Sequence, residues 1–376
     1  MRRCFKREEA SILLQIYWQR HRQIHRLPCH SDAPQLARYY ISRKELQNAR
    51  HVFDKIPNPS VVLWNMMIRA YAWDGPFQQS IHLYNHMLQL GVTPTKFTFP
   101  FVLKACSALQ ALQLGRVIHN HAHVLGLSMD VYVSTALLDM YAKCGNLFEA
   151  YKLFNTMSYM DRDIVAWNAM IAAFSFHGLH VETMQLVAQM LQAGIAPNSS
   201  TLVSVLPTIG QANALRQGKA IHAHCVRKFF CDNVVLATAL LDMYAKCHYL
   251  SYARKIFDNV NLKNEICWSA MIGGYVLHDS MADALALYDD MVCIYNLNPT
   301  PATLAIVLRA CAQLTDLKKG KNLHCHMIKS GIQLDTTVGN SLISMYAKCG
   351  IMDGAMGFLD EMTSKDPVSY SAIISG

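Results

Sequence analysis

The pentapeptide MYAKC occurs three times in this chain, at Met140–Cys144, Met243–Cys247 and Met345–Cys349. Its tyrosines are 103 and then 102 residues apart in a chain of 376 residues. A single copy would indicate only a helix fragment. Three evenly spaced copies indicate that the whole chain is built from repeats, and this periodicity decides the fold.

Two other elements repeat in phase with MYAKC. One is a tryptophan, and the other is a Gly-basic-x-aliphatic-His element, which reads GRVIH, GKAIH and GKNLH. The tryptophans are Trp64, Trp167 and Trp268, and the glycine-led elements begin at Gly115, Gly218 and Gly320. In a repeat array each unit packs only on its neighbours, so the length of the chain does not set a number of globular domains.

Composition excludes two classes of protein. Hydrophobic residues make up 52% of the chain and charged residues 16%, which is too apolar for a disordered protein. No stretch approaches the roughly 18 consecutive apolar residues of a membrane-spanning helix. The composition suits a helical array that buries apolar side chains on both faces of its helices, and no membrane association is expected.

The net charge of +8 is concentrated at the N-terminus. Residues 1–29 contain seven Lys and Arg but two acids, Glu8 and Glu9. An Arg-rich start suggests an organelle-targeting peptide. The acidic pair and the scarcity of serine favour a solvated helical cap instead, and the residues alone leave both alternatives open.

The twelve cysteines contain no CxxC pair. Cys144, Cys247 and Cys349 share one slot of the repeat, and Cys106 and Cys311 share another. A free cysteine behaves as a small apolar side chain. We therefore expect structural thiols in a reducing compartment rather than disulfides or a zinc site.

Each long period contains smaller helical units. Apolar residues between 131 and 157 recur at steps of three and four on either side of Gly145, which is helical spacing. Glycine is a common residue just after a helix. The sequence therefore predicts helix–turn–helix units and an all-α fold.

These residues resemble the plant pentatricopeptide repeat. The resemblance rests on units of about 35 residues with WNAMI, YAKCG, the glycine-led histidine element and a closing GIxP, and it points to the subclass that alternates standard, long and short (PLS) motifs. It implies an all-α, right-handed α-solenoid superhelix. The implied motifs are ten in tandem, at 30–60, 61–95, 96–130, 131–163, 164–198, 199–233, 234–264, 265–300, 301–335 and 336–366, with a further motif beginning at 367–376. We expect the natural protein to be longer, or this chain to be a fragment or a truncated gene product.

The resemblance implies binding of single-stranded RNA, with one base read by each repeat. In the family, the fifth and last residues of a motif choose the base. In the standard and short motifs these pairs are Asn65/Thr95, Thr135/Asp163, Asn168/Asn198, Thr238/Asn264, Ser269/Thr300 and Asn340/Asp366. The alternative interpretation of these polar residues is ordinary helix capping, because Asn, Asp and Thr favour helix starts.

The same resemblance assigns bases to four pairs. Thr135/Asp163 implies G, Asn168/Asn198 a pyrimidine, Thr238/Asn264 A and Asn340/Asp366 U. The long motifs have Pro100/Asp130, Val203/Asn233 and Ala305/Asp335. Their fifth residues offer no hydrogen bond to a base, so no base is assigned to them.

Lys143, Lys246 and Lys348 occupy one position in the three MYAKC copies. In the family this position can approach the RNA backbone, and phosphate contacts position a chain without reading its sequence. The alternative is a solvated lysine on a helix surface.

The sequence shows no catalytic constellation. His180 and Glu182 form an HxE triplet, but no CxxC follows to complete a deaminase zinc site. His119 and His121 are two residues apart on a helix and point about 200° apart, so they cannot share one ion. We expect no enzyme activity, no metal and no cofactor.

The predicted function is sequence-specific binding of single-stranded RNA in a plant organelle, the mitochondrion or alternatively the chloroplast. The protein would be a monomer that directs RNA editing or other processing, with editing-complex proteins or a deaminase supplied in trans. The alternatives are a helical scaffold that binds proteins and a nonfunctional truncated copy. The sequence does not identify the transcript.

Overall fold

The computed structural model describes residues 33–158, 162–228, 233–329, 335–362 and 365–374. The basic segment 1–29 and the first residues of the expected motif 30–60 lie outside the described residues. Throughout the described ranges the regular elements are helices, which confirms the predicted all-α class. Among the helices described, none is long and apolar enough to cross a membrane.

The chain divides into two compact units, Met1–Arg162 and Asp163–Gly376. The helices of the first unit are α2 (Ala33–Ser42), α3 (Leu46–Phe53), α4 (Val61–Asp74), α5 (Phe77–Gln89), α6 (Phe99–Ala108), α7 (Leu112–Val124), α8 (Val131–Lys143) and α9 (Leu147–Thr156). Those of the second unit are α10 (Ile164–Phe176), α11 (His180–Gln192), α12 (Ser199–Gln211), α13 (Leu215–Arg227), α14 (Val234–Lys246), α15 (Leu250–Asn259), α16 (Glu265–Leu277), α17 (Met281–Asp289), η2 (Asp290–Ile294), α18 (Pro301–Leu314), α19 (Leu317–Lys329), α20 (Thr336–Lys348), α21 (Met352–Glu361) and α22 (Pro367–Ile374).

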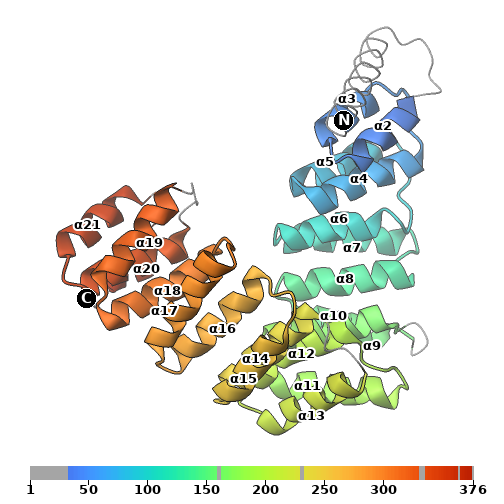
Figure 1. Cartoon of the computed structure of the whole chain (residues 1–376). Helices are drawn as coiled ribbons and strands as arrows, with labels where there is room; N and C mark the ends of the chain where they lie inside the picture. Colours follow the sequence, from blue (N-terminus) through green and yellow to red (C-terminus); the bar gives the residue numbers. More distant parts are fainter. Residues whose placement is uncertain (1–32, 159–161, 229–232, 330–334, 363–364, 375–376) are drawn as a thin grey trace, which may run out of the picture. The chain divides into compact units, whose positions relative to one another are not determined.

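Within each unit the helices form hairpins that stack in chain order (Figure 1). We call the two helices of a hairpin its first and second helix. The first helices pack on one another, as α4, α6 and α8 do in the first unit and α10, α12 and α14 do in the second. Each second helix packs on its own first helix and, within its unit, on the first helix that follows. This is the stacked helical-hairpin arrangement predicted from the repeats.

The first helices form the core because they are apolar nearly all round. In α10 the side chains of Trp167, Met170 and Ile171 are at most 2% exposed. A helix that is hydrophobic on most sides is buried by its neighbours, and within the second unit α11 and α12 pack on α10. The helix begins at Asp163, whose carboxylate accepts the backbone N–H groups of Val165 and Ala166.

The three MYAKC copies lie at the ends of α8, α14 and α20 and hold the hairpins together. In the copy on α14, a Cβ added to Gly218 would lie 2.5 Å from Met243 Sδ, so the glycine makes room for the methionine. Tyr244 bonds His222 at 2.9 Å, and the Cys247 thiol donates to the carbonyl of Ile209 at 3.9 Å. The glycine-led element and the pentapeptide are therefore two sides of one helix contact.

Most of the described cysteines are packing residues, whereas Cys293 and Cys325 are exposed. Cys106 and Cys311 are fully buried, and burial raises the pKa of each thiol to about 12. Such thiols are not ionised at neutral pH and are poor nucleophiles and metal ligands. Each cysteine in the described part of the chain is a free thiol.

One hairpin contains an irregular second helix. The expected motif 265–300 is one residue longer than the motif 164–198, and in it α17 continues into a π-helical turn, Asp290–Ile294. A π-turn accommodates one extra residue within a helix. The insertion is therefore accommodated within the second helix of this hairpin.

Candidate nucleic-acid interface

The last residue of most expected motifs is the N-cap of the next first helix; in the motif 61–95 the cap of α6 is instead Thr98, three residues after Thr95. The side chains of Asp163, Asn198 and Asn264 accept backbone N–H groups from α10, α12 and α16. The capping role that the sequence offered as an alternative is therefore real at these positions. Capping occupies one side-chain oxygen and leaves the rest of the side chain for other contacts.

In the motif 164–198, the fifth and last residues lie within hydrogen-bond distance of each other. Asn168 Nδ2 donates to Asn198 Oδ1 at 3.3 Å. A third residue, Thr201, completes the cluster, because its hydroxyl donates to Asn168 Oδ1 at 2.6 Å. Thr201 is the third residue of the next motif, and its side chain is fully buried.

The same three-residue cluster recurs at three other motif junctions. It joins the fifth residue, the last residue and the third residue of the following motif. Its members are Asn65, Thr95 and Thr98; Ser269, Thr300 and Thr303; and Asn340, Asp366 and Ser369. We call these four sets the junction clusters.

The two pairs whose fifth residue is threonine are arranged differently. Thr238 donates its hydroxyl to the Val234 carbonyl at 2.8 Å, and Asn264 accepts the Cys267 backbone N–H. The described residues show no hydrogen bond between Thr238 and Asn264. Thr135 lies in the first unit, with a buried hydroxyl that has no hydrogen-bond partner among the described residues; Asp163 begins the second unit.

The long motifs have no junction cluster. Pro100, Val203 and Ala305 have no side-chain donor or acceptor, as the sequence indicates. The last residues Asp130 and Asn233 cap α8 and α14. Asp130 also forms an ion pair with Lys96, at 3.3 Å.

The three lysines lie in the last turns of α8, α14 and α20. Lys143 pairs with Asp139 at 2.8 Å and Lys246 with Asp242 at 2.6 Å, each one helical turn apart. Lys348 has Ser344 in place of the aspartate. Exposed pairs of this kind are weak, so the lysines stay available to a phosphate, and their role stays a prediction.

Sequence reasoning missed a row of exposed apolar side chains. They share the second position of their motifs, beside the junctions, and are between 56% and 64% exposed. They are Val62, Phe97, Tyr132, Val165, Val235, Ile266 and Val368. Apolar residues exposed at one repeated position mark an interaction surface more clearly than single ones do. The sequence signal was an apolar residue at the second position of seven motifs, off the buried stripe.

The histidine that ends each glycine-led element forms a hydrogen bond with a tyrosine. His119, His222 and His324 bond the hydroxyl groups of Tyr141, Tyr244 and Tyr346, each at 2.9 Å. Burial lowers the pKa of His119 and of His222. A search of the described residues found no group of three or more metal-ligating side chains.

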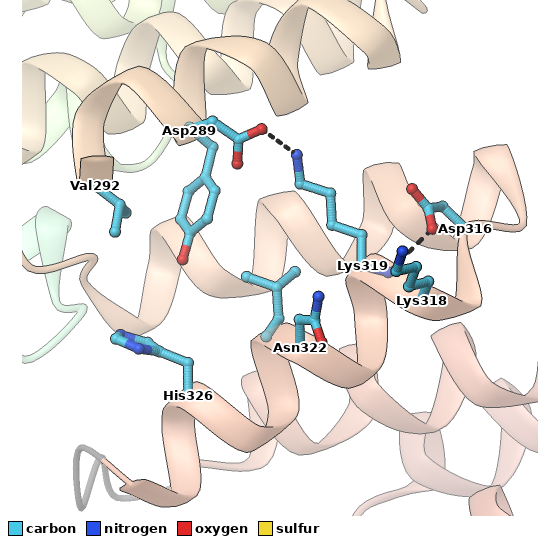
Figure 2. Close-up of a pocket in the computed structure, with 9 residues that line it drawn as sticks. Asp289, Val292, Asp316, Lys318, Lys319, Asn322 and His326 are labelled. Carbon is cyan, nitrogen blue, oxygen red and sulfur yellow. Dashed lines mark hydrogen bonds and ion pairs between the residues drawn. The ribbon is translucent and has the colours of Figure 1, made fainter. Parts of the chain in front are cut away.

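Figure 2 shows an open pocket of about 470 Å³ beside η2, away from the junctions. Its main charged groups pair with each other: Lys319 Nζ lies 2.6 Å from Asp289 Oδ2 and also donates to the Leu285 carbonyl. The Asp316 carboxylate caps α19 at Lys319 N. No residue of a junction cluster lines this pocket.

Comparison with known proteins gives a consistent result. A family model described as "PPR repeat" matches residues 132–161, 165–195, 266–294 and 340–366, and one described as "PPR repeat family" matches 59–108. A pentatricopeptide repeat-containing protein of Arabidopsis thaliana is 44% identical over 345 residues, which are 91% of this chain and 52% of that protein. A chloroplastic and a mitochondrial relative from the same plant are each 33% identical, with 88% and 90% of this chain and 40% and 32% of the relatives covered. The chain thus spans about half or less of the length of these relatives.

Solved structures show the same fold. The crystal structure of the pentatricopeptide repeat protein PPR10 in complex with an 18-nucleotide psaJ RNA element matches with a TM-score of 0.67 at 18% identity, over 91% of this chain and 52% of that one. PPR10 from maize matches with a TM-score of 0.52 at 15% identity, over 93% and 61%. At these identities the likeness concerns the helical-hairpin fold.

Proposed function

We propose that this chain, which is similar to pentatricopeptide repeat proteins over about nine-tenths of its length, binds single-stranded RNA and reads bases with the fifth and last residues of its standard and short motifs. The observation that carries the proposal is the junction cluster. It joins these two residues by a direct hydrogen bond at three places, and at the fourth Ser269 and Thr300 both bond Thr303. The proposal includes the ten motif boundaries and the alternation of standard, long and short motifs. In this proposal the long motifs separate the base-reading motifs along the chain and do not themselves select a base.

The hydrogen bonds inside a cluster determine which atoms face outward. At Asp366, Oδ1 accepts from Asn340 Nδ2 and from the Ser369 backbone. Oδ2 is left as an acceptor, and Asn340 has a second N–H to donate. Uracil presents an N3–H donor beside carbonyl acceptors, so this site complements uracil on its Watson–Crick edge.

The corresponding site in the motif 164–198 has a different outward pattern. Asn198 Oδ1 faces the cluster, where it accepts from Thr201 and Asn168, so its amide nitrogen faces outward. Two donors, from Asn168 and Asn198, complement the O2 and N3 acceptors of cytosine. This sharpens the pyrimidine assignment to a preference for C over U.

The carboxylate of Asp366 stays ionised under any ordinary binding condition. Hydrogen bonds from the Ser369 backbone and from Asn340 lower its pKa below the usual value of 3.8. The exposed second residues of the motifs flank the bases as stacking surfaces, which is how proteins hold unpaired bases without sequence preference. Lys143, Lys246 and Lys348 lie eight residues, about 12 Å of helix, beyond the fifth residues and contact phosphates.

The cellular role in the proposal is to direct editing or other processing of an organellar transcript. The location is the mitochondrion, with the chloroplast as the alternative. The curated relatives include proteins of both organelles. The chemistry would come from editing-complex proteins or a deaminase in trans, and the chain would act as a monomer.

Selection from a pooled random RNA library tests this function. The purified chain should enrich single strands with one seven-nucleotide pattern: G, a pyrimidine, any base, A, any two bases and U. The pattern should appear in one strand direction only. Duplex DNA should compete poorly. Absence of enrichment, or equal binding of duplex DNA, would instead favour a protein-binding scaffold.

A further inference from the structure

We propose that the buried hydroxyl residue of each junction cluster, Thr98, Thr201, Thr303 or Ser369, is a positioning residue that determines which atoms of the fifth residue face the RNA. The inference rests on the proposed function and goes beyond it. It adds a third residue, from the following motif, to the pair that reads a base. This residue acts through the side chain that it holds.

The orientation follows from counting protons in the cluster at Thr201. The Thr201 hydroxyl accepts the backbone N–H of Asn198 at 3.1 Å, so its own single proton must go to another atom. The shortest contact open to it is Asn168 Oδ1 at 2.6 Å, against 3.0 Å for Asn198 Oδ1. The hydroxyl thus selects the carbonyl end of the Asn168 amide.

This choice fixes the Asn168 amide in one of its two orientations. With Oδ1 held by Thr201, one Nδ2 proton goes to Asn198 and the other points out of the cluster. Without the hydroxyl, the amide could turn by 180° and present an acceptor instead of a donor. A base that presents an acceptor to the Asn168 amide would then no longer bind more tightly than a base that presents a donor.

Two other clusters have the same direction of hydrogen bonding, from the hydroxyl to the amide oxygen. The Thr98 hydroxyl lies 2.7 Å from Asn65 Oδ1, and the Ser369 hydroxyl lies 2.6 Å from Asn340 Oδ1. Each hydroxyl also accepts a backbone N–H from the last residue of the preceding motif, at 2.9 and 3.2 Å. The cluster at Ser269 uses two hydroxyl groups, with 2.6 Å between Ser269 Oγ and Thr303 Oγ1.

Burial separates this role from direct RNA contact. All four hydroxyl residues are 0% exposed, so a nucleotide cannot touch them. Where the fifth residue is Thr135 or Thr238, the residue at the positioning place is Ala166 or Cys267. An amide has two orientations and needs one of them fixed, whereas a hydroxyl can rotate about its C–O bond. All three asparagine clusters contain the positioning hydroxyl, and at Ser269 the Thr303 hydroxyl instead fixes the direction of a hydroxyl–hydroxyl bond.

The test compares Thr201→Val with Thr201→Ser. Dissociation constants are measured for four RNAs that differ only at the nucleotide assigned to the motif 164–198. Wild type and Thr201→Ser should prefer C, whereas in Thr201→Val the ratio of C to U affinity should fall about tenfold, toward one. The preference at the nucleotide assigned to Asn340/Asp366 should not change.

The matched control is Thr208→Val, on the same helix. Thr208 is also buried, but its hydroxyl has no hydrogen-bond partner among the described residues, so this variant should keep the wild-type ratio. Thermal melting reports any loss of folding, and Ser369→Ala at the uracil site repeats the test on another helix, with the same loss of base preference expected.

The outcomes separate the two proposals. If Thr201→Val or Ser369→Ala binds all four RNAs more weakly but keeps the wild-type ratios, the hydroxyl is a helix cap only, and the positioning role is overturned. If the wild-type chain itself does not distinguish the four RNAs at either site, the proposed base reading is overturned, and the positioning role with it.

Discussion

Single polar atoms decide what each junction can recognise. Asn198 and Asp366 occupy equivalent places, and both use one oxygen to cap a helix. They differ in the outward atom, which is an amide nitrogen in one and a carboxylate oxygen in the other. Exchanging these two residue types should therefore exchange the preferred base and leave the fold intact, because Asn and Asp cap helices about equally well.

Asp366→Asn tests this exchange. The new amide donates where the carboxylate accepted, so preference at this nucleotide should move from U to C. The expected change in relative affinity corresponds to about 1–3 kcal/mol, the usual worth of one well-formed pair of contacts to a base. Binding of two RNAs that differ only in this nucleotide measures it. Asp353→Asn, on the exposed face of α21, is the control, and an unchanged U preference in Asp366→Asn would contradict the assignment.

A second prediction concerns the lysines. Replacing Lys143, Lys246 and Lys348 with Ala should weaken binding of all RNAs alike, because phosphates carry no sequence information. Each lost phosphate contact lowers the slope of log affinity against log salt by about 0.7 for single strands, so the triple variant should lose about 2 from that slope. The control replaces three exposed lysines of second helices, Lys152, Lys255 and Lys321. Equal slopes in the two triple variants would leave the lysines as solvated surface residues.

At this scale the sequence predicted part of the candidate site. It identified the fifth and last residues through their periodic positions, and the structure brings four of the pairs together. It did not reveal Thr98 or Thr201, because a hydroxyl three places after a cap is also an ordinary capping box. Their contacts with Asn65 and Asn168 join residues 33 apart, and only the fold brings them together.

Among the elements, the first and second helices have different tasks. First helices make the core and carry the junction clusters at their N-terminal ends, while second helices brace them from one side. The contact between Met243 and Gly218 shows how closely the two sets approach. A side chain at this glycine would push the methionine out of its place.

Gly218→Ala should therefore destabilise the chain, by about 1–3 kcal/mol for an overpacked core site. Urea denaturation measures the change. Gly357→Ala is the opposite case, because nothing lies within 4 Å of its Cβ position on α21, and it should be stabilising by about 0.5–1 kcal/mol. A Gly218→Ala chain as stable as wild type would show that Met243 moves aside freely.

The histidine–tyrosine contacts between α7 and α8 and between α13 and α14 predict a pH dependence. Burial lowers the pKa of His119 and His222 below the ordinary value of 6.5. The unfolded chain then takes up these protons first, so stability should fall as the pH drops below about 6.5. When both histidines are replaced with Gln, the melting temperature should fall less between pH 7 and pH 5 than it does in the wild type. The exposed His51→Gln is the control, and an unchanged slope in the double variant would exclude these histidines as its source.

For the whole chain, the periodic landmarks were enough to predict the class and the hairpin architecture. Trp64, Trp167 and Trp268 are buried at the same place in three hairpins, at most 2% exposed. The sequence did not show how the extra residue in 265–300 is accommodated. A π-turn, a bulged loop and a shifted helix are all compatible with one added residue, and packing against neighbouring helices selects among them.

The central claim is that successive motifs read successive nucleotides, so the order and spacing of bases matter more than their identity alone. The most direct measurement is the affinity of the chain for an unstructured RNA that carries G, C, any base, A, any two bases and U in the order of the motifs from 131 to 366, compared with a scrambled RNA of the same composition. The ordered RNA, in one polarity, should bind at least about tenfold more tightly, as two or more matched bases require. Equal affinity for the ordered and scrambled strands in both polarities would contradict the account.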